Sequence, residues 1–227
     1  MDDTLREEQK LTARAVLARE GRGFAEEIGL GRTNNPASLF GLLVAAVVVA
    51  PRGEAREAAR AAHEVANRWH TATDLAAASE RDVAGELGAA VEGVDRGDGD
   101  DSASGAAATL VGLATALVET WGGDLRALRE KAGQDPDRER ALLTDLPGVD
   151  DAVADVFLRE VQVLWDEVAP FADDRALRAA AALGLGESAE DLARYGAQPE
   201  KIGRLAGALA RIDVEGSHDE VRHAAAS

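Results

Sequence analysis

Apolar residues recur at helical spacing along most of the chain, and no stretch alternates apolar and polar residues between hairpin turns. The pattern predicts an all-α fold. In the first part of the chain, helices are expected at about residues 4–20, 36–50 and 54–69 and within 71–87. The second of these begins at Pro36, which follows two asparagines and suits the first position of a helix.

Residues 93–105 interrupt this pattern. They are glycine, aspartate and serine for the most part, so we expect a mobile, solvated loop there. Helices are again expected over residues 106–121, 124–132 and 136–143, from 151 up to Pro170, from 173 onward and around 202–209. On the helix from 151, apolar positions form one stripe that should be buried. The stripe consists of Val153, Val156, Phe157, Val161 and Leu164.

The composition is that of a chain that folds, with 46% hydrophobic residues among 227. This is enough for one large domain or two small helical lobes. The chain has no cysteine, which excludes disulfides, cysteine-ligated clusters and cysteine nucleophiles. Its four histidines are not spaced to build a site on one helix face, so we expect no metal and no cofactor.

The most obvious apolar run, Leu39 to Ala50, is well short of the roughly 20 residues that a membrane-spanning helix needs. It should be a buried core helix. The first ten residues are charged and do not resemble a secretory signal. We therefore expect a cytoplasmic protein that does not associate with membranes.

The net charge is −17, from 42 acidic and 25 basic residues. Such a charge opposes binding to nucleic acid, whose affinity depends on cationic side chains at phosphates. It is also typical of proteins adapted to molar salt, where a screening length of about 3 Å suppresses self-repulsion. The charge therefore weakens a DNA-binding hypothesis without excluding it.

The most specific signal is a Leu-Pro-Gly-Val-Asp turn between two helices, formed by Leu146, Pro147, Gly148, Val149 and Asp150. Glycine permits a backbone conformation that a side chain would block, and the N–H groups that open the next helix can bind a phosphate. The same residues also suit an ordinary connection between two helices.

The chain resembles the helix–hairpin–helix DNA glycosylase superfamily that includes endonuclease III, and more closely a prokaryotic branch labelled endonuclease-like. The resemblance covers about residues 34–185. It rests on the order of five parts: NPASLFGLLVAAVVVA, TATDLAAASERDVAGEL, a helix ending WGGDL, the LPGVD turn, and PFADDRALRAAAALGL. It implies a two-lobed helical fold with a cleft that receives a base flipped out of duplex DNA.

Three parts follow from this resemblance. Residues 1–33 are expected to form an N-terminal helical extension, 34–185 the glycosylase-like core, and 186–227 C-terminal helices with a frayed tail. The resemblance also implies that Asp173 matches the aspartate that assists departure of the base, since a carboxylate stabilises an oxocarbenium-like sugar. Asp173 equally suits an N-cap of the following helix, so that replacement by asparagine would hardly change stability.

The chain departs from the family pattern at two places. Ala152 stands where bifunctional members carry the lysine that forms a Schiff base, so no lyase step by that route is expected. Asp150, Asp151 and Asp155 would compete with a phosphate for the N–H groups that follow the turn. The sequence thus leaves two hypotheses: a glycosylase without lyase activity, or a catalytically inactive module that binds DNA or a protein partner.

Other residues admit two interpretations. Three tryptophans could stack on bases, but core packing is the simpler role: Trp69, Trp121 and Trp165. Three arginines near the expected cleft could reach phosphates, or form salt bridges on helix surfaces: Arg159, Arg175 and Arg178.

Overall fold

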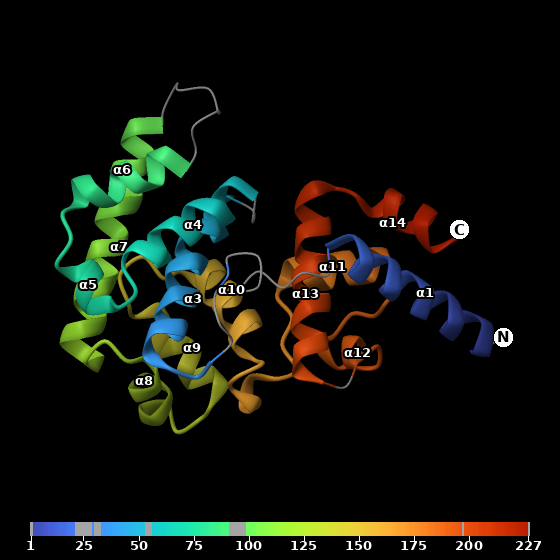
Figure 1. The fold of residues 1–227 in the computed structure, drawn as a ribbon. Coiled ribbons are helices and arrows are strands. Elements are labelled where there is room, and N and C mark those ends of the chain that lie inside the picture. The colour runs from blue at the N-terminus through green and yellow to red at the C-terminus, as the bar shows by residue number, and fades with distance from the viewer. Residues whose placement is uncertain are drawn as a thin grey trace. The chain divides into compact units, whose positions relative to one another are not determined.

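The computed structural model describes residues 2–20, 29, 33–52, 56–90, 99–196 and 198–226. Every element in these ranges is an α-helix or a short 3-10 helix, with no strand among them (Figure 1). The predicted all-α class is confirmed. The chain forms two compact units, one of residues 27–157 and one of residues 1–26 together with 158–227.

The unit of residues 27–157 is built around two apolar helices. Its elements are α3 (Pro36–Val49), η1 (Ala50–Arg52), α4 (Arg56–Arg68), α5 (Ala72–Ala76), α6 (Glu80–Ala90), α7 (Gly99–Trp121), α8 (Leu125–Ala132), α9 (Pro136–Thr144) and the first turns of α10 (Asp151–Val161). Helix α3 starts as predicted, because Asn35 accepts a hydrogen bond from the Ser38 N–H and Pro36 follows. Helix α3 packs on α4, and α7 packs on α5 and α6.

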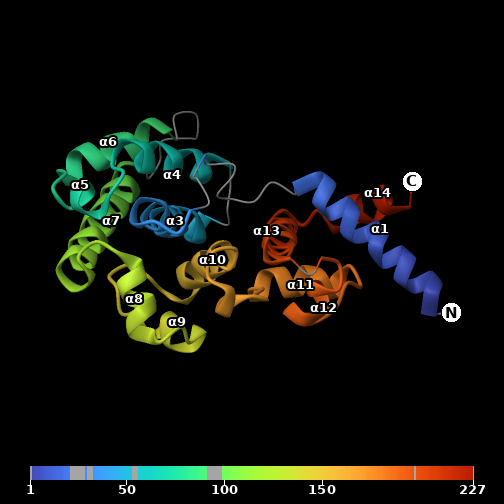
Figure 2. The same cartoon turned by 60° about the horizontal axis from the view of Figure 1, so that its bottom comes forward.

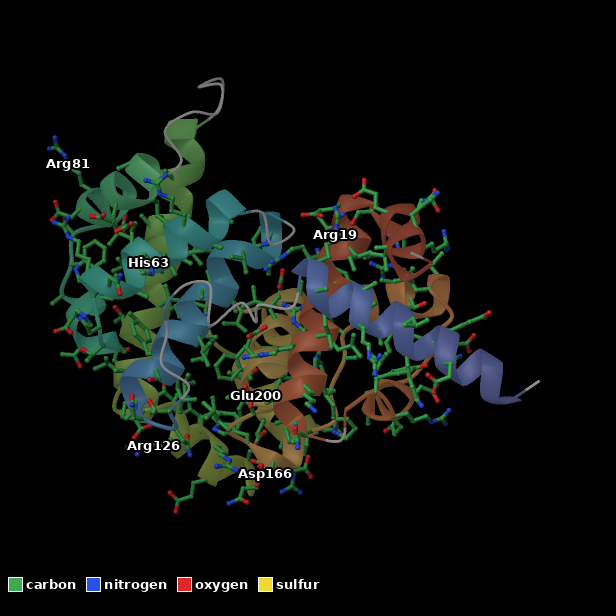
Figure 3. The ribbon with its side chains drawn as sticks, turned by 45° about the vertical axis from the view of Figure 1, so that its right-hand side comes forward. Arg19, His63, Arg81, Arg126, Asp166 and Glu200 are labelled. Atoms are coloured by element: carbon green, nitrogen blue, oxygen red, sulfur yellow. The ribbon has the colours of Figure 1, made fainter. Side chains whose placement is uncertain are left out.

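The unit of residues 1–26 and 158–227 has its core between α11 and α13. Its helices are α1 (Asp2–Glu20), the end of α10, η2 (Asp166–Val168), α11 (Asp174–Ala182), α12 (Ala189–Ala193), α13 (Pro199–Glu215) and α14 (His218–Ala225). Helix α13 lies beside α11, and α1 packs on α13 and α14 (Figure 2). Arg19, which is labelled in Figure 3, lies in the last turn of α1. Its guanidinium is 2.6 Å from the carboxylate of Glu220 on α14.

Two sequence predictions about element bounds need correction. Residues 93–98 of the predicted loop lie outside the described residues, but 99–105 belong to α7. Four alanines between residues 103 and 108 explain the extension, because alanine has the highest helix propensity. Helix α10 ends at Val161, well before Pro170, and a 3-10 turn fills part of the interval.

The last helix of the chain, α14, packs on its unit through two interactions. Helix α14 continues to Ala225, and Val221 is buried. The Arg222 side chain donates a hydrogen bond to the carbonyl of Ala182 at the end of α11. The tail is therefore attached to its unit by a buried apolar residue and a side-chain bond.

The compact units group the chain differently from the predicted ranges 1–33, 34–185 and 186–227. Residues from 158 onward belong with the N-terminal helix, and the boundary between the units falls within α10.

Helix α7 contains a long apolar segment. Residues Ala103–Trp121 are long and apolar enough, by length and composition, to cross a membrane. Three leucines of this segment, Leu110, Leu113 and Leu117, are fully buried in the unit of residues 27–157. Core helices of soluble proteins pass the same test, so this feature assigns no location to the protein.

Candidate functional site

The 146–150 turn joins α9 to α10. The Val149 N–H donates to the carbonyl of Leu146 at 3.1 Å, which closes the turn. Leu146 and Val149 are buried, whereas Pro147, Gly148 and Asp150 are exposed. The turn is thus anchored by its two apolar residues and presents the other three to solvent.

Gly148 is required by both its conformation and its surroundings. Its φ is +75°, in the region that favours glycine. A Cβ at this position would lie 2.1 Å from Cγ2 of Thr109 on α7. The glycine therefore lets α7 approach the turn closely, in addition to any role toward a ligand.

Asp150 caps α10. Its Oδ1 accepts a hydrogen bond from the Val153 N–H at 2.9 Å, and its carbonyl accepts from the Ala154 N–H. One N–H group that an incoming phosphate could use is thus already bonded to a carboxylate.

The two other acids after the turn share an arginine partner from α9. The Arg140 guanidinium donates to Asp155 Oδ1 at 2.5 Å and to Asp151 Oδ1 at 3.2 Å. The hydrogen bond to Asp155 is the main reason why the pKa of Arg140 is raised, with Asp151 adding to it. These acids therefore join α9 to α10, which reduces the repulsion that the sequence alone suggests.

Asp173 is a buried N-cap. Its side chain Oδ1 accepts from the Ala176 N–H at 2.9 Å, and Oδ2 accepts from Arg159 Nη1 at 2.5 Å. The residue is 6% exposed. The capping role is present in the structure, and both oxygens are held by donors, so the carboxylate has a fixed orientation.

Arg159, the partner of Asp173, is fully buried, which corrects the expectation of a surface arginine. Its Nε lies 3.6 Å from Glu160 Oε1. Gly207 of α13 faces this pair, since a Cβ there would be 3.7 Å from both atoms. This part of α13 therefore lies within van der Waals range of the Arg159 guanidinium.

The segment that leads to Asp173 is held by Gln162. The Gln162 amide donates to the carbonyls of Arg159 at 2.8 Å and Phe171 at 3.0 Å, and it accepts from the Phe171 N–H at 3.0 Å. This one side chain, fully buried, ties the end of α10 to the backbone two residues before Asp173.

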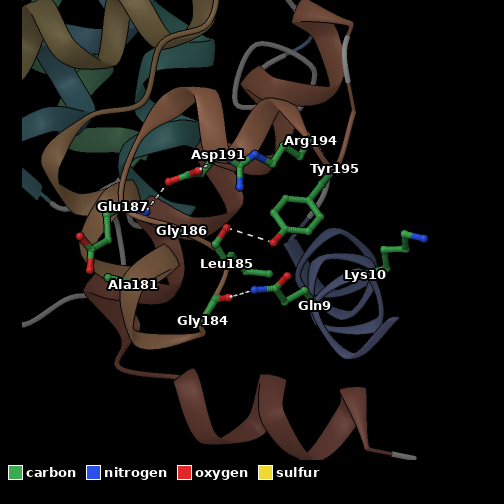
Figure 4. Close-up of a pocket in the computed structure, with 10 residues that line it drawn as sticks. All are labelled: Gln9, Lys10, Ala181, Gly184, Leu185, Gly186, Glu187, Asp191, Arg194 and Tyr195. Carbon is green, nitrogen blue, oxygen red and sulfur yellow. Dashed lines mark hydrogen bonds and ion pairs between the residues drawn. The ribbon is translucent and has the colours of Figure 1, made fainter. Parts of the chain in front are cut away.

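A cavity of about 730 Å³ lies elsewhere in the same unit, between α1, the end of α11 and α12, and Asp173 does not line it (Figure 4). Its floor is the loop after α11. Gln9 donates to the carbonyl of Gly184, and the Tyr195 hydroxyl donates to that of Leu185. Burial raises the pKa of the Tyr195 phenol above its usual 10.0. No local pattern in the sequence predicts this cavity, because its lining residues come from two distant segments, residues 9–10 and 181–195.

The remaining candidates have simpler surroundings. Trp165 is fully buried, and Trp69 and Trp121 are half-buried. Arg178 pairs with Asp213 of α13 at 2.8 Å. Ala152 is exposed on α10 and offers no amine. Within the ranges that the structure covers, no three histidine, aspartate or glutamate residues are grouped so that they could hold a metal ion.

The predicted site residues fall in both compact units: the 146–150 turn in residues 27–157, and Asp173 in the other. Comparison of the chain with models of protein families, with curated proteins and with solved structures finds no match.

Proposed function

We propose that the protein is a glycosylase-like helix–hairpin–helix protein of base-excision repair that cleaves the bond between a damaged base and its sugar, without a lyase step. The order of the sequence parts supports the class. The observation that carries the proposal is the orientation of Asp173, whose two oxygens are fixed by Arg159 and by the Ala176 N–H. A preorganised carboxylate suits the stabilisation of positive charge on a sugar.

In this reaction, the protein binds the duplex backbone through the 146–150 turn and the target base leaves the stack. As the bond to the base breaks, positive charge develops on the sugar and the Asp173 carboxylate stabilises it. Water then attacks the sugar carbon, and the proton that the water loses neutralises the departed base, so that the products are the free base and an abasic sugar with a hydroxyl group. Because residue 152 is alanine, no covalent adduct forms by the lysine route.

A second candidate is a catalytically inactive module that binds DNA or a protein partner. Two observations favour it. The Arg159 guanidinium offsets the charge of Asp173 at 2.5 Å, which reduces what the carboxylate can offer to a cationic sugar. The Asp150 carboxylate also occupies an N–H group that a phosphate would need.

The test is base release from lesion-bearing duplexes in molar potassium chloride, with the parent protein, Asp173→Asn and a control. Asp135→Asn is a matched control, because Asp135 also caps a nine-residue helix through its side chain. We expect the parent to release a base and Asp173→Asn to lose roughly a hundredfold in rate, about 3 kcal/mol, while Asp135→Asn keeps its rate.

Borohydride should trap no adduct between the parent and abasic DNA. Equal cleavage by Asp173→Asn and the parent would show that the carboxylate has no catalytic role. Absence of base release from every lesion at every salt concentration would favour the inactive module instead.

A further inference from the structure

Arg159 has an unusual place for an arginine. It is 0% exposed, and such residues are rarely fully buried unless they are paired. Its Nη1 meets Asp173 Oδ2, and its backbone carbonyl accepts a hydrogen bond from Gln162. The carbonyl also lies 3.4 Å from where a Cβ of Gly203 would be, so α13 passes close to this part of α10.

Two glycines on α13 lie next to Arg159. Gly203 and Gly207 are one turn apart on the same face of the helix, the first next to the Arg159 backbone and the second next to its Nε. The guanidinium is thus enclosed between α13 and the start of α11. An arginine has a planar set of donors with a fixed geometry, and lysine cannot reproduce it.

We infer that Arg159 is a positioning residue for Asp173, an inference that rests on the proposed function. Oδ1 of Asp173 caps α11, and the guanidinium donates to the other oxygen, Oδ2. Together the two hydrogen bonds fix the rotation of the carboxylate. Gln162 fixes the backbone on either side, since it bonds to residues 159 and 171. Asp173 alone would be held by only one N–H group and could turn away from a sugar.

A double-mutant cycle on the rate tests this role, because residues that act through one another do not have additive effects. Arg159→Lys should lower single-turnover base release by roughly tenfold while duplex affinity stays constant. In the Asp173→Asn background the same change should have no further effect. If the two losses multiply, or if Arg159→Lys is as fast as the parent, the inference is overturned.

Arg178→Lys is the control for the rate cycle. Arg178 also connects α11 to α13, through Asp213, but does not contact Asp173. Its replacement should leave base release unchanged in both backgrounds. If Arg178→Lys lowers the rate of base release as much as Arg159→Lys does, the effect does not depend on contact with Asp173. This outcome would also overturn the inference.

A second double-mutant cycle measures melting temperature. It tests the Arg159–Asp173 contact independently of base release. Arg159→Met leaves the Asp173 carboxylate without its guanidinium, so adding Asp173→Asn to it should raise the melting temperature. In the parent, Asp173→Asn should lower it. If Asp173→Asn lowers melting equally in both backgrounds, the two side chains are not coupled and the inference fails. A parent that releases no base but shows this change of sign would refute the proposed function and leave the Arg159–Asp173 contact established.

Discussion

The Asp173 carboxylate takes part in two interactions. It caps α11 through a hydrogen bond, and it forms a buried ion pair with Arg159. Asparagine preserves the first, since it caps a helix about as well as aspartate. It removes the second, because the Arg159 guanidinium loses the negative charge at Oδ2. A buried charge that loses its partner destabilises the fold, although Glu160 at 3.6 Å offers Arg159 another carboxylate.

We therefore expect Asp173→Asn to lower the free energy of unfolding by about 1–3 kcal/mol, measured by denaturant unfolding in molar potassium chloride. From the cap alone, the sequence predicts almost no change. Asp135→Asn should cost less than about 0.5 kcal/mol, because Asp135 is a solvent-exposed cap. Equal, small losses for both variants would show that the buried pair does not contribute to stability.

At the scale of elements, two glycines with nearly the same φ allow the cost of backbone strain to be separated from the cost of a steric clash. Gly148 has a φ of +75° and Gly133, the C-cap of α8, a φ of +74°. A Cβ on Gly148 would meet Thr109 at 2.1 Å, whereas a Cβ on Gly133 would have nothing within 4 Å. Alanine is strained at both positions, but it clashes only at the first.

Gly133→Ala should cost about 1–2 kcal/mol of unfolding free energy, the usual penalty for a left-handed backbone with a side chain. Gly148→Ala should cost about 1–3 kcal/mol more, because α7 or the turn must move. Thr109→Ser removes the methyl group in question and should recover much of that extra loss in the double variant. Equal costs at the two glycines would mean that α7 does not approach the turn as described.

Most element positions could be predicted from the sequence, because their signals are local. Pro36 after Asn35, Asp150 before α10 and Asp173 before α11 each mark a helix start through hydrogen bonds that span three residues. The start of α7 differs from the prediction because the glycines and serines of this segment suggest a loop. In the structure, the helix propensity of the nearby alanines outweighs that preference.

The surroundings of the candidate site could not be predicted in the same way. Arg159 and Asp173 are 14 residues apart, and Gly207 is on a third helix, so only the packing of α10, α11 and α13 brings them together. The ion pairs of Arg140 with Asp151 and Asp155 likewise need the angle between α9 and α10. The sequence shows which side chains are acidic, but not which basic side chain pairs with each of them.

At the scale of the whole molecule, the net charge of −17 sets a dependence on salt. Like charges repel in dilute solution, and the Debye length falls from about 10 Å at 0.1 M to about 3 Å at 1 M. We expect the melting temperature to rise over this range of potassium chloride, with most of the gain at the lower concentrations where screening changes most. A melting temperature that does not depend on salt would contradict adaptation to molar salt.

The packing of α1 against α13 and α14 has a consequence for the order in which the chain folds during synthesis. Gln9 bonds to the carbonyl of Gly184, 175 residues later, and Arg19 pairs with Glu220. During synthesis, α1 therefore leaves the ribosome long before α13 and α14, the helices on which it packs, whereas residues 27–157 form one continuous stretch that can collapse earlier. Until α13 and α14 have been made, the nascent chain lacks the helices that cover the apolar side of α1, which includes Ala13 and Val16.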